Sequence, residues 1–159
     1  MILREYEELD VIRKGHSEEK IVYASGTFDI MHVGHVSFFE QCRKQGDILV
    51  VGVAEDSVIR EYKGPKRPVQ NERQRAKMLV SLKPVNYCFI NKSHNFSELD
   101  IIFSHLRPDF YVISEDARTI EVQRKYAAQN RVELVILDKL MEGDLNISTT
   151  QLIEKIKDL

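Results

Sequence analysis

Residues 21–35 read IVYASGTFDIMHVGH, and this stretch decides the fold because it passes from a strand pattern to a helix pattern. The apolar, partly β-branched run Ile21–Ala24 predicts a buried strand. Over Val33–Gln45, apolar residues at helical spacing predict an amphipathic helix, and Gly46 is placed to end it. The stretch therefore joins a strand to a helix through a short loop that begins near Gly26.

The same alternation of strand and helix patterns continues along the chain. Near-continuous apolar strands are typical of a parallel sheet covered on both faces, and parallel neighbours need right-handed helical crossovers. We therefore expect an α/β fold, a doubly wound sandwich with a five-stranded parallel sheet. The expected strands are Ile21–Ala24, Ile48–Val53, Tyr87–Ile90, Phe110–Ile113 and Val132–Leu137, and the expected helices are Val33–Gln45, Asn71–Leu82, Ser97–Leu106, Thr119–Asn130 and Ser148–Leu159.

The length of 159 residues and the hydrophobic content of 43% suit one globular domain with its own core. We expect residues 20–159 to form this domain and residues 1–19, which are charged and less regular, to be an N-terminal extension packed on it. The 23 basic and 25 acidic residues are mixed along the chain and give a formal net charge of -2. No global field marks the chain for nucleic acid or membrane, so an anionic ligand needs a local site.

The two cysteines, Cys42 and Cys88, lack metal-type spacing, and the N-terminus lacks the pattern of a signal segment. No apolar run approaches the roughly 20 residues that span a bilayer. These features predict a cytoplasmic protein with reduced thiols and no membrane or nucleic-acid partner.

The loop after the first expected strand is the natural place for a ligand, because doubly wound sheets bind ligands beyond the carboxyl ends of their strands. Gly26 lets the backbone turn tightly, and free N–H groups at the helix start point toward an anion. His32 and His35 are three residues apart, so both imidazoles can lie on one face of the first helical turn. Gly34 leaves room between them for a phosphate.

Three interpretations compete for this histidine pair. One imidazole could cap the helix while the other packs in the core. A zinc pair on a helix is usually spaced by four with a glutamate between, which weakens a metal interpretation. Phosphate binding is favoured because strand, glycine, hydroxyl, aspartate and helix start occur together within residues 25–35.

The motifs Gly26-Thr27-Phe28-Asp29 and His32-Val33-Gly34-His35 together resemble the signature of the cytidylyltransferase-like nucleotidyltransferases. The resemblance implies a single Rossmann-like domain in which Gly26, Thr27, Phe28, Asp29 and Gly34 bind the nucleotide. It also implies that His32 and His35 stabilise the charge that develops at the α-phosphorus when an acceptor phosphate attacks in line and pyrophosphate leaves. Positioning and charge stabilisation supply most of such catalysis, so no nucleophilic side chain is needed.

The role of Asp29 stays open within this motif. Its carboxylate could orient a histidine or a hydrated Mg²⁺, or it could shape the turn.

Residues 62–69, YKGPKRPV, read as a basic loop after the second expected strand and its helix. The run resembles the corresponding loop of the ADP-heptose-synthase-type adenylyltransferases, and Lys63 matches their phosphate-binding lysine. This resemblance implies a catalytic role for Lys63 and bears less directly on Lys66 and Arg67, whose roles stay open. A solvated charge run is the alternative interpretation.

Two later segments resemble further phosphate-binding elements of the family. Arg75 matches an arginine whose guanidinium could clamp phosphate oxygens, although a surface salt bridge is the alternative. The run Ile147-Ser148-Thr149-Thr150 is a helix N-cap in any protein, and the resemblance implies that it also faces the nucleotide. Both interpretations can hold at once because a helix start is itself an anion site.

Some positions depart from the family pattern. Ser114-Glu115-Asp116 stands where relatives often carry Gly-Asp, Ile113 replaces a lysine, and Asn146 replaces a frequent glycine. These departures fall where base and acceptor are recognised, so they leave the substrates undetermined.

The sequence thus predicts an enzyme that transfers a nucleoside monophosphate from a nucleoside triphosphate to a small sugar phosphate or polyol phosphate. The basic-loop match favours ATP, and the resemblance implies Mg²⁺ as cofactor and a homodimer. One alternative is a CTP-dependent enzyme acting on glycerol 3-phosphate or another phosphorylated or phosphonate acceptor. Others are a non-catalytic nucleotide sensor and a structural α/β module.

Overall fold

A six-stranded parallel sheet forms the centre of the computed structural model, which describes residues 1–92, 96–117, 119–138 and 147–159. The strand order is β1-β4-β3-β2-β5-β6, and every pair of neighbours is parallel. The expected doubly wound α/β fold is therefore confirmed. The strands are β1 (Ile2–Leu3), β2 (Ile21–Gly26), β3 (Ile48–Ala54), β4 (Tyr87–Asn91), β5 (Phe110–Ser114) and β6 (Glu133–Leu137).

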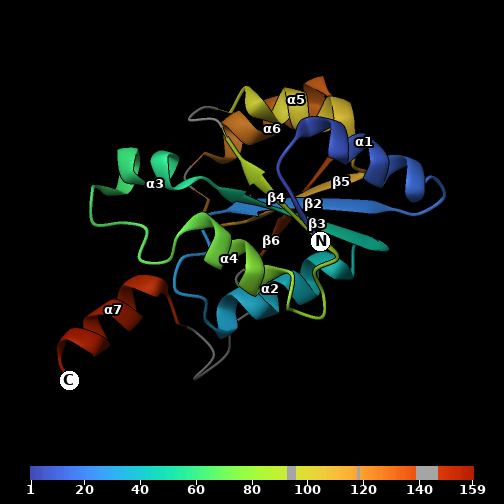
Figure 1. Ribbon diagram of the computed structural model, residues 1–159. Coiled ribbons are helices and arrows are strands. Elements are labelled where there is room, and N and C mark those ends of the chain that lie inside the picture. Colours follow the sequence, from blue (N-terminus) through green and yellow to red (C-terminus); the bar gives the residue numbers. More distant parts are fainter. Residues whose placement is uncertain (93–95, 118, 139–146) are drawn as a thin grey trace.

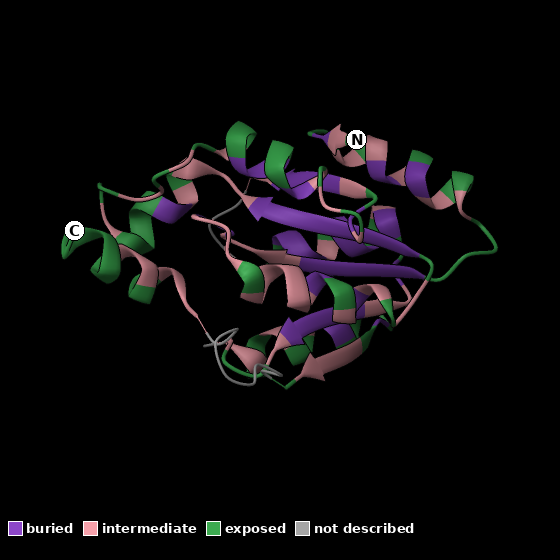
Figure 2. Cartoon of the chain, turned by 90° about the horizontal axis from the view of Figure 1, so that it is seen from below, coloured by how far each residue is buried: buried purple, intermediate pink, exposed green. Residues whose placement is uncertain are grey.

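Helices cover both faces of the sheet, with α1, α5 and α6 on one face and α2 and α4 on the other (Figure 1). Each face carries its own apolar core, and the central strands are buried along their length (Figure 2). The near-continuous apolar character of the strands follows from this burial on both faces of the sheet. The helices are α1 (Tyr6–Gly15), α2 (Val33–Arg43), α3 (Asp56–Lys63), α4 (Glu72–Leu79), α5 (Glu98–Leu106), α6 (Ile120–Gln129) and α7 (Thr149–Lys157).

Residues 1–19, expected as an extension, are built into this architecture. Strand β1 pairs with β4 and supplies the sixth strand, which the sequence did not predict because two residues show no periodicity. Helix α1 buries Leu9 and Ile12 in the core on its face of the sheet. The N-terminal segment therefore extends the sheet and its core.

The expected basic loop begins later than the sequence suggested. Tyr62 and Lys63 form the last turn of α3, and the chain leaves the helix at Gly64. Ile59 anchors this short helix in the interior, while basic residues in its last turn complement the helix dipole.

The direction of winding reverses at β2, which lies between β3 on one side and β5 on the other. In such sheets, this reversal opens a crevice at the carboxyl ends of the strands. The loop after β2 occupies the place at which the sequence predicted a ligand site. No helix in the described part of the chain is long and apolar enough to cross a membrane.

Gly52 in β3 offers a direct test of the packing beside this crevice. A Cβ at position 52 would lie 2.1 Å from the Tyr23 hydroxyl and 2.7 Å from Oδ1 of Asn91. We expect Gly52→Ala to lower the free energy of unfolding by roughly 1–3 kcal/mol, because Tyr23 is completely buried and cannot move away freely. Urea denaturation measures the change.

Gly15→Ala is the matched control, because nothing lies within 4 Å of a Cβ at the end of α1. An equal loss of stability in both variants would contradict the packing argument.

Candidate active site

Two cavities open at the carboxyl edge of the sheet, on either side of the signature loop, defined as residues 27–32 between β2 and α2. The first cavity, of about 410 Å³, lies between the start of α2, the end of β5 and the start of α7. The second, of about 490 Å³, lies among the ends of β2, β3 and β4 and the helices α3 and α5. Of the described residues, only Ser25 and Gln123 line both cavities, so the two spaces meet at these side chains.

The first cavity contains the paired histidines at the start of α2. Their imidazole rings stack with 3.8 Å between centroids and an interplanar angle of 29°. The backbone N–H of His32 donates to Nδ1 of His35 at 3.4 Å. Because this nitrogen accepts, the hydrogen of the neutral His35 ring lies on Nε2, where it can be donated to a ligand. Both imidazoles lie together on the first helical turn, as the spacing predicted.

Aromatic packing fixes the ring of His35. Phe28 meets it edge-on, with 5.5 Å between centroids and an angle of 83°, and Phe28 in turn packs on Phe39 at 4.9 Å. Burial, together with the nearby charges of His32 and Lys63, lowers the pKa of His35 to about 4. His35 is therefore an uncharged hydrogen-bond donor at neutral pH.

The signature loop carries local backbone strain. Phe28 and Ile30 adopt left-handed conformations, with φ of 49° and 53°, which are uncommon for side chains of this kind. A Cβ at Gly26 would lie 2.8 Å from the Phe28 ring. The sequence suggested that Gly26 lets the backbone approach a ligand, whereas in the structure its missing side chain makes room for Phe28.

Asp29 shapes the turn, which was one of the two roles considered for it. The carboxylate is buried and accepts hydrogen bonds from the backbone N–H groups of Val69 at 2.9 Å and Gln70 at 3.0 Å. Arg67 forms an ion pair with it at 2.7 Å. Burial alone would raise the pKa of Asp29, but these donors outweigh burial and lower it. The Asp29 carboxylate thus connects the basic loop to the signature loop, and both of its oxygens accept hydrogen bonds from that loop.

Arg75 does not face either cavity, which corrects the expectation of a phosphate clamp. Its side chain is completely buried, so the surface salt bridge considered as the alternative is also wrong. The guanidinium donates to three backbone carbonyls and forms an ion pair with Asp56, with distances of 2.6–2.9 Å. The accepting carbonyls belong to Gln70, Thr27 and Ala54. Arg75 therefore positions the loops that surround the cavities.

Thr27 lies in the second cavity, and Lys63 lies beside Tyr62, which lines that cavity. Thr27 lines the second cavity, and its hydroxyl shares a hydrogen bond of 2.7 Å with the Tyr62 hydroxyl. The Lys63 ammonium lies 5.6 Å from the centre of the Tyr62 ring. Lys63 lines neither cavity, but its charge acts on His35.

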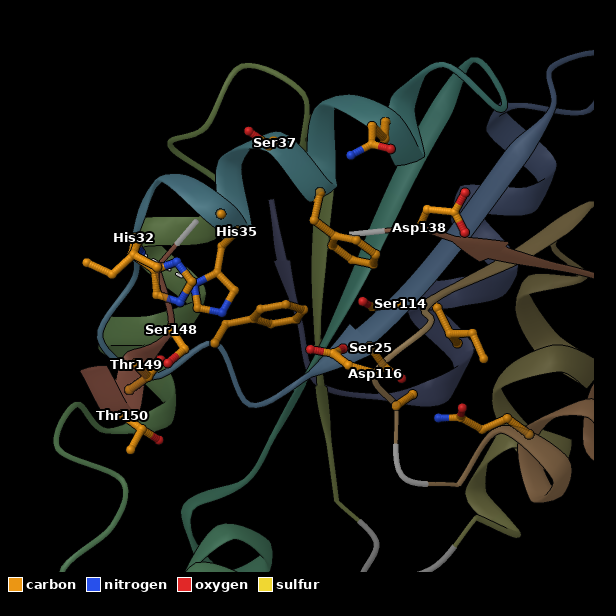
Figure 3. Close-up of a pocket in the computed structure, with 18 residues that line it drawn as sticks. Ser25, His32, His35, Ser37, Ser114, Asp116, Asp138, Ser148, Thr149 and Thr150 are labelled. Carbon is orange, nitrogen blue, oxygen red and sulfur yellow. Dashed lines mark hydrogen bonds between the residues drawn. The ribbon is translucent and has the colours of Figure 1, made fainter. Parts of the chain in front are cut away.

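The start of α7 lies next to the histidines at the same end of the first cavity, as Figure 3 shows for Ser148, Thr149 and Thr150. Ser148 caps the helix by accepting from the N–H of Gln151 at 3.3 Å. The Thr149 hydroxyl donates to the backbone carbonyl of Asp29 at 3.0 Å, which ties this helix to the signature loop. Ile147 and Gly34 also line the first cavity, whereas Asn146 lies outside the described residues.

The far end of the first cavity was predicted only in part. Ser114, Asp116 and Asp138 gather there, away from the histidines (Figure 3). Ser114 and Asp116 were noted as departures from the family pattern in the region where base and acceptor are recognised, whereas nothing in the sequence singled out Asp138 or Gln123. Among the described residues, no three His, Cys, Asp or Glu side chains are grouped to hold a metal ion.

A parallel sheet whose winding reverses at β2, with a cavity at the carboxyl end of that strand, has the architecture of the Rossmann-like nucleotide-binding proteins. A cytidylyltransferase-like family model matches residues 23–155, and the chain belongs to this family. The expected enzyme class, nucleotidyltransferase, is confirmed with it.

Known proteins support the same assignment. The chain is 36% identical over 143 residues to the "Bifunctional protein HldE" of Helicobacter pylori strain G27, covering 89% of this chain and 28% of that protein. It is 35% identical over 156 residues to the protein of the same name from Campylobacter jejuni strain RM1221, covering 98% and 32%. The chain thus spans less than a third of the length of these curated relatives.

Solved structures show the same fold. A lipopolysaccharide core biosynthesis protein from Thermoplasma volcanium superposes with a TM-score of 0.65 at 27% identity, covering 79% of this chain and 99% of that one. A pantoate-beta-alanine ligase from Francisella tularensis has the same TM-score at 15% identity, covering 100% and 78%. The second likeness shows the fold alone.

The depressed pKa of His35 predicts a pH-dependent stability. The group has a pKa of about 4 in the folded chain against 6.5 when unperturbed, so between these values the unfolded state binds more protons. The contribution of His35 to the free energy of unfolding is therefore complete above pH 6.5 and is lost as the pH falls toward 4. From pH 6.5 to 4.5, we expect the wild-type chain to lose about 2 kcal/mol more stability than His35→Gln. Urea unfolding at both pH values measures the difference, and parallel losses would contradict it.

Proposed function

We propose that the first cavity binds a nucleoside triphosphate and that the second holds a small phosphorylated acceptor. The observation that carries this proposal is the placement of the His32–His35 pair beside the start of α7 at one end of the first cavity. In the proposed reaction, an acceptor phosphate oxygen forms a bond to the α-phosphorus. The bond from that phosphorus to the bridging oxygen breaks, and pyrophosphate leaves with its electron pair.

The hydrogen-bond donors of the first cavity suit a triphosphate. His35 can donate from Nε2 without carrying a charge, and the first turns of α2 and α7 present N–H groups and the positive ends of their dipoles. Donors held in place before the reaction stabilise developing charge without reorganisation. We assign His32 and His35 to the α-phosphate. We assign to Lys63 an electrostatic interaction with the same phosphates from outside the cavity lining.

The opposite end of the first cavity suits a nucleoside. Asp116, Asp138 and Ser114 offer acceptors for hydroxyl and amino groups, and Phe38 offers an aromatic surface. We favour ATP because the basic loop resembles that of adenylyltransferases. CTP is the alternative nucleotide substrate.

We propose that Mg²⁺ enters the first cavity with the triphosphate. Mg²⁺ usually keeps several waters and binds through substrate phosphates, so Asp116 and Asp138, which lie at the nucleoside end away from the histidines, are not needed as its ligands. When bound to the phosphates, the ion would neutralise charge on the leaving pyrophosphate.

A sugar phosphate is the favoured acceptor. The Thermoplasma protein is described as acting in lipopolysaccharide core biosynthesis, and such cores are built from sugars. Polar side chains at the base of the second cavity, among them Asn91 and Tyr111, could bind sugar hydroxyls. A CTP-dependent enzyme acting on glycerol 3-phosphate or a phosphonate acceptor is the alternative.

Pyrophosphate release tests the proposal. We expect the chain to release pyrophosphate from ATP in the presence of Mg²⁺ and a sugar phosphate, in a screen that pairs ATP and CTP with sugar phosphates, glycerol 3-phosphate and phosphonates. Release with CTP alone would favour the alternative. Nucleotide binding without release from any pair would indicate a sensor and would contradict the enzymatic proposal.

His35→Ala is the variant that links this activity to the histidines. We expect kcat to fall by about 100-fold or more while nucleotide affinity weakens less, because the side chain acts mainly in the transition state. Val11→Ala on α1 serves as the control, since its exposed side chain lies outside both cavities. Equal losses of affinity and turnover in His35→Ala would contradict the assignment.

A further inference from the structure

Gln123 on α6 stands where the two cavities meet. It lines both of them, as does Ser25 at the end of β2. Any ligand that reaches from one cavity toward the other must pass these two side chains. Under the proposed function, this is the region in which the nucleotide and the acceptor approach each other.

Hydrogen bonds orient the amide of Gln123. Its side chain is hydrogen-bonded to Tyr111, and this bond acts to lower the pKa of Tyr111. Burial nevertheless raises the pKa of Tyr111 to about 12, so the phenol stays protonated. The Tyr111 hydroxyl also shares a hydrogen bond of 3.3 Å with the Ser25 hydroxyl. The amide of Gln123 therefore lies against a buried phenol.

The oxygen end of the same amide is unsatisfied. Oε1 of Gln123 is buried, and it has no hydrogen-bond partner in the described parts of the chain. Buried polar atoms in folded proteins nearly always have a partner, and an exception at a cavity calls for a ligand or another specific explanation.

We propose that Oε1 of Gln123 accepts a hydrogen bond from a substrate hydroxyl at the junction of the two cavities, which makes Gln123 a specificity-determining residue. An amide oxygen only accepts, so it selects an alcohol and disfavours a phosphate oxygen, an ether or a deoxy position there. The hydroxyl belongs either to the ribose in the first cavity or to the acceptor in the second. The inference rests on the proposed function and adds a requirement for a hydroxyl at this position.

Gln123→Met tests the proposal because methionine has a similar length and no carbonyl. If the ribose supplies the hydroxyl, we expect the Kd for ATP to rise about tenfold or more in the variant. The wild-type chain should then show a similar loss with 2′-deoxy-ATP or 3′-deoxy-ATP. If the acceptor supplies it, the Kd for ATP stays within about threefold while the KM for the acceptor rises about tenfold or more and kcat changes little.

Gln129→Met is the matched control, because Gln129 is exposed on the last turn of the same helix and lines neither cavity. We expect Gln129→Met to keep the wild-type Kd for ATP and the wild-type KM for the acceptor. The free Gln123→Met chain should keep or raise its Tm, since the substitution removes an unsatisfied buried carbonyl, whereas a purely structural glutamine would lower it. The deoxynucleotides and deoxygenated acceptors probe the wild-type chain even if the variant does not fold.

The outcomes separate this inference from the proposed function. Pyrophosphate release by the wild-type chain, with the nucleotide Kd and the acceptor KM of Gln123→Met and the deoxy substrates all within about threefold of normal, would overturn the inference alone. A wild-type chain that neither binds nucleotide nor releases pyrophosphate would overturn both.

Discussion

The buried guanidinium of Arg75 is the contact on which the loops at the carboxyl edge of the sheet depend. It joins the carbonyl of Thr27 in the signature loop, the carbonyl of Ala54 at the end of β3 and the Asp56 carboxylate at the start of α3. Removing this cation would leave those acceptors buried or partly buried without their donor, which is far more costly than losing one exposed ion pair. A charge placed inside the protein thus sets the distance between the segments that border both cavities.

Asp29 complements Arg75 from the other side of the signature loop. Its carboxylate holds the basic loop, while its own carbonyl accepts from Thr149 and so reaches the start of α7. With the loop fixed at both ends, Phe28 can keep its left-handed backbone conformation and press against His35. The uncharged state and orientation of the His35 ring therefore follow from contacts made well outside the histidine pair.

Much of this arrangement could be predicted from the sequence, because strand patterns and the motif around His32 and His35 are local. The course of the two-residue strand β1 could not, since its place depends on pairing with β4. Arg75 was assigned to a phosphate because it matches an arginine of the family, and the sequence does not show that its side chain is buried. Gln123 escaped prediction for a related reason: its importance comes from where α6 packs, and no motif marks it.

The central claim is that phosphates of a nucleotide lie between the histidine pair and the start of α7. A crystal structure of the chain with a non-hydrolysable ATP analogue and Mg²⁺ tests it most directly. The account predicts the α-phosphate within hydrogen-bonding distance of His35 Nε2, with the triphosphate against the first turn of α7 and the base toward Asp116 and Asp138. A nucleotide bound only in the second cavity, or with its phosphates away from both histidines, would contradict it.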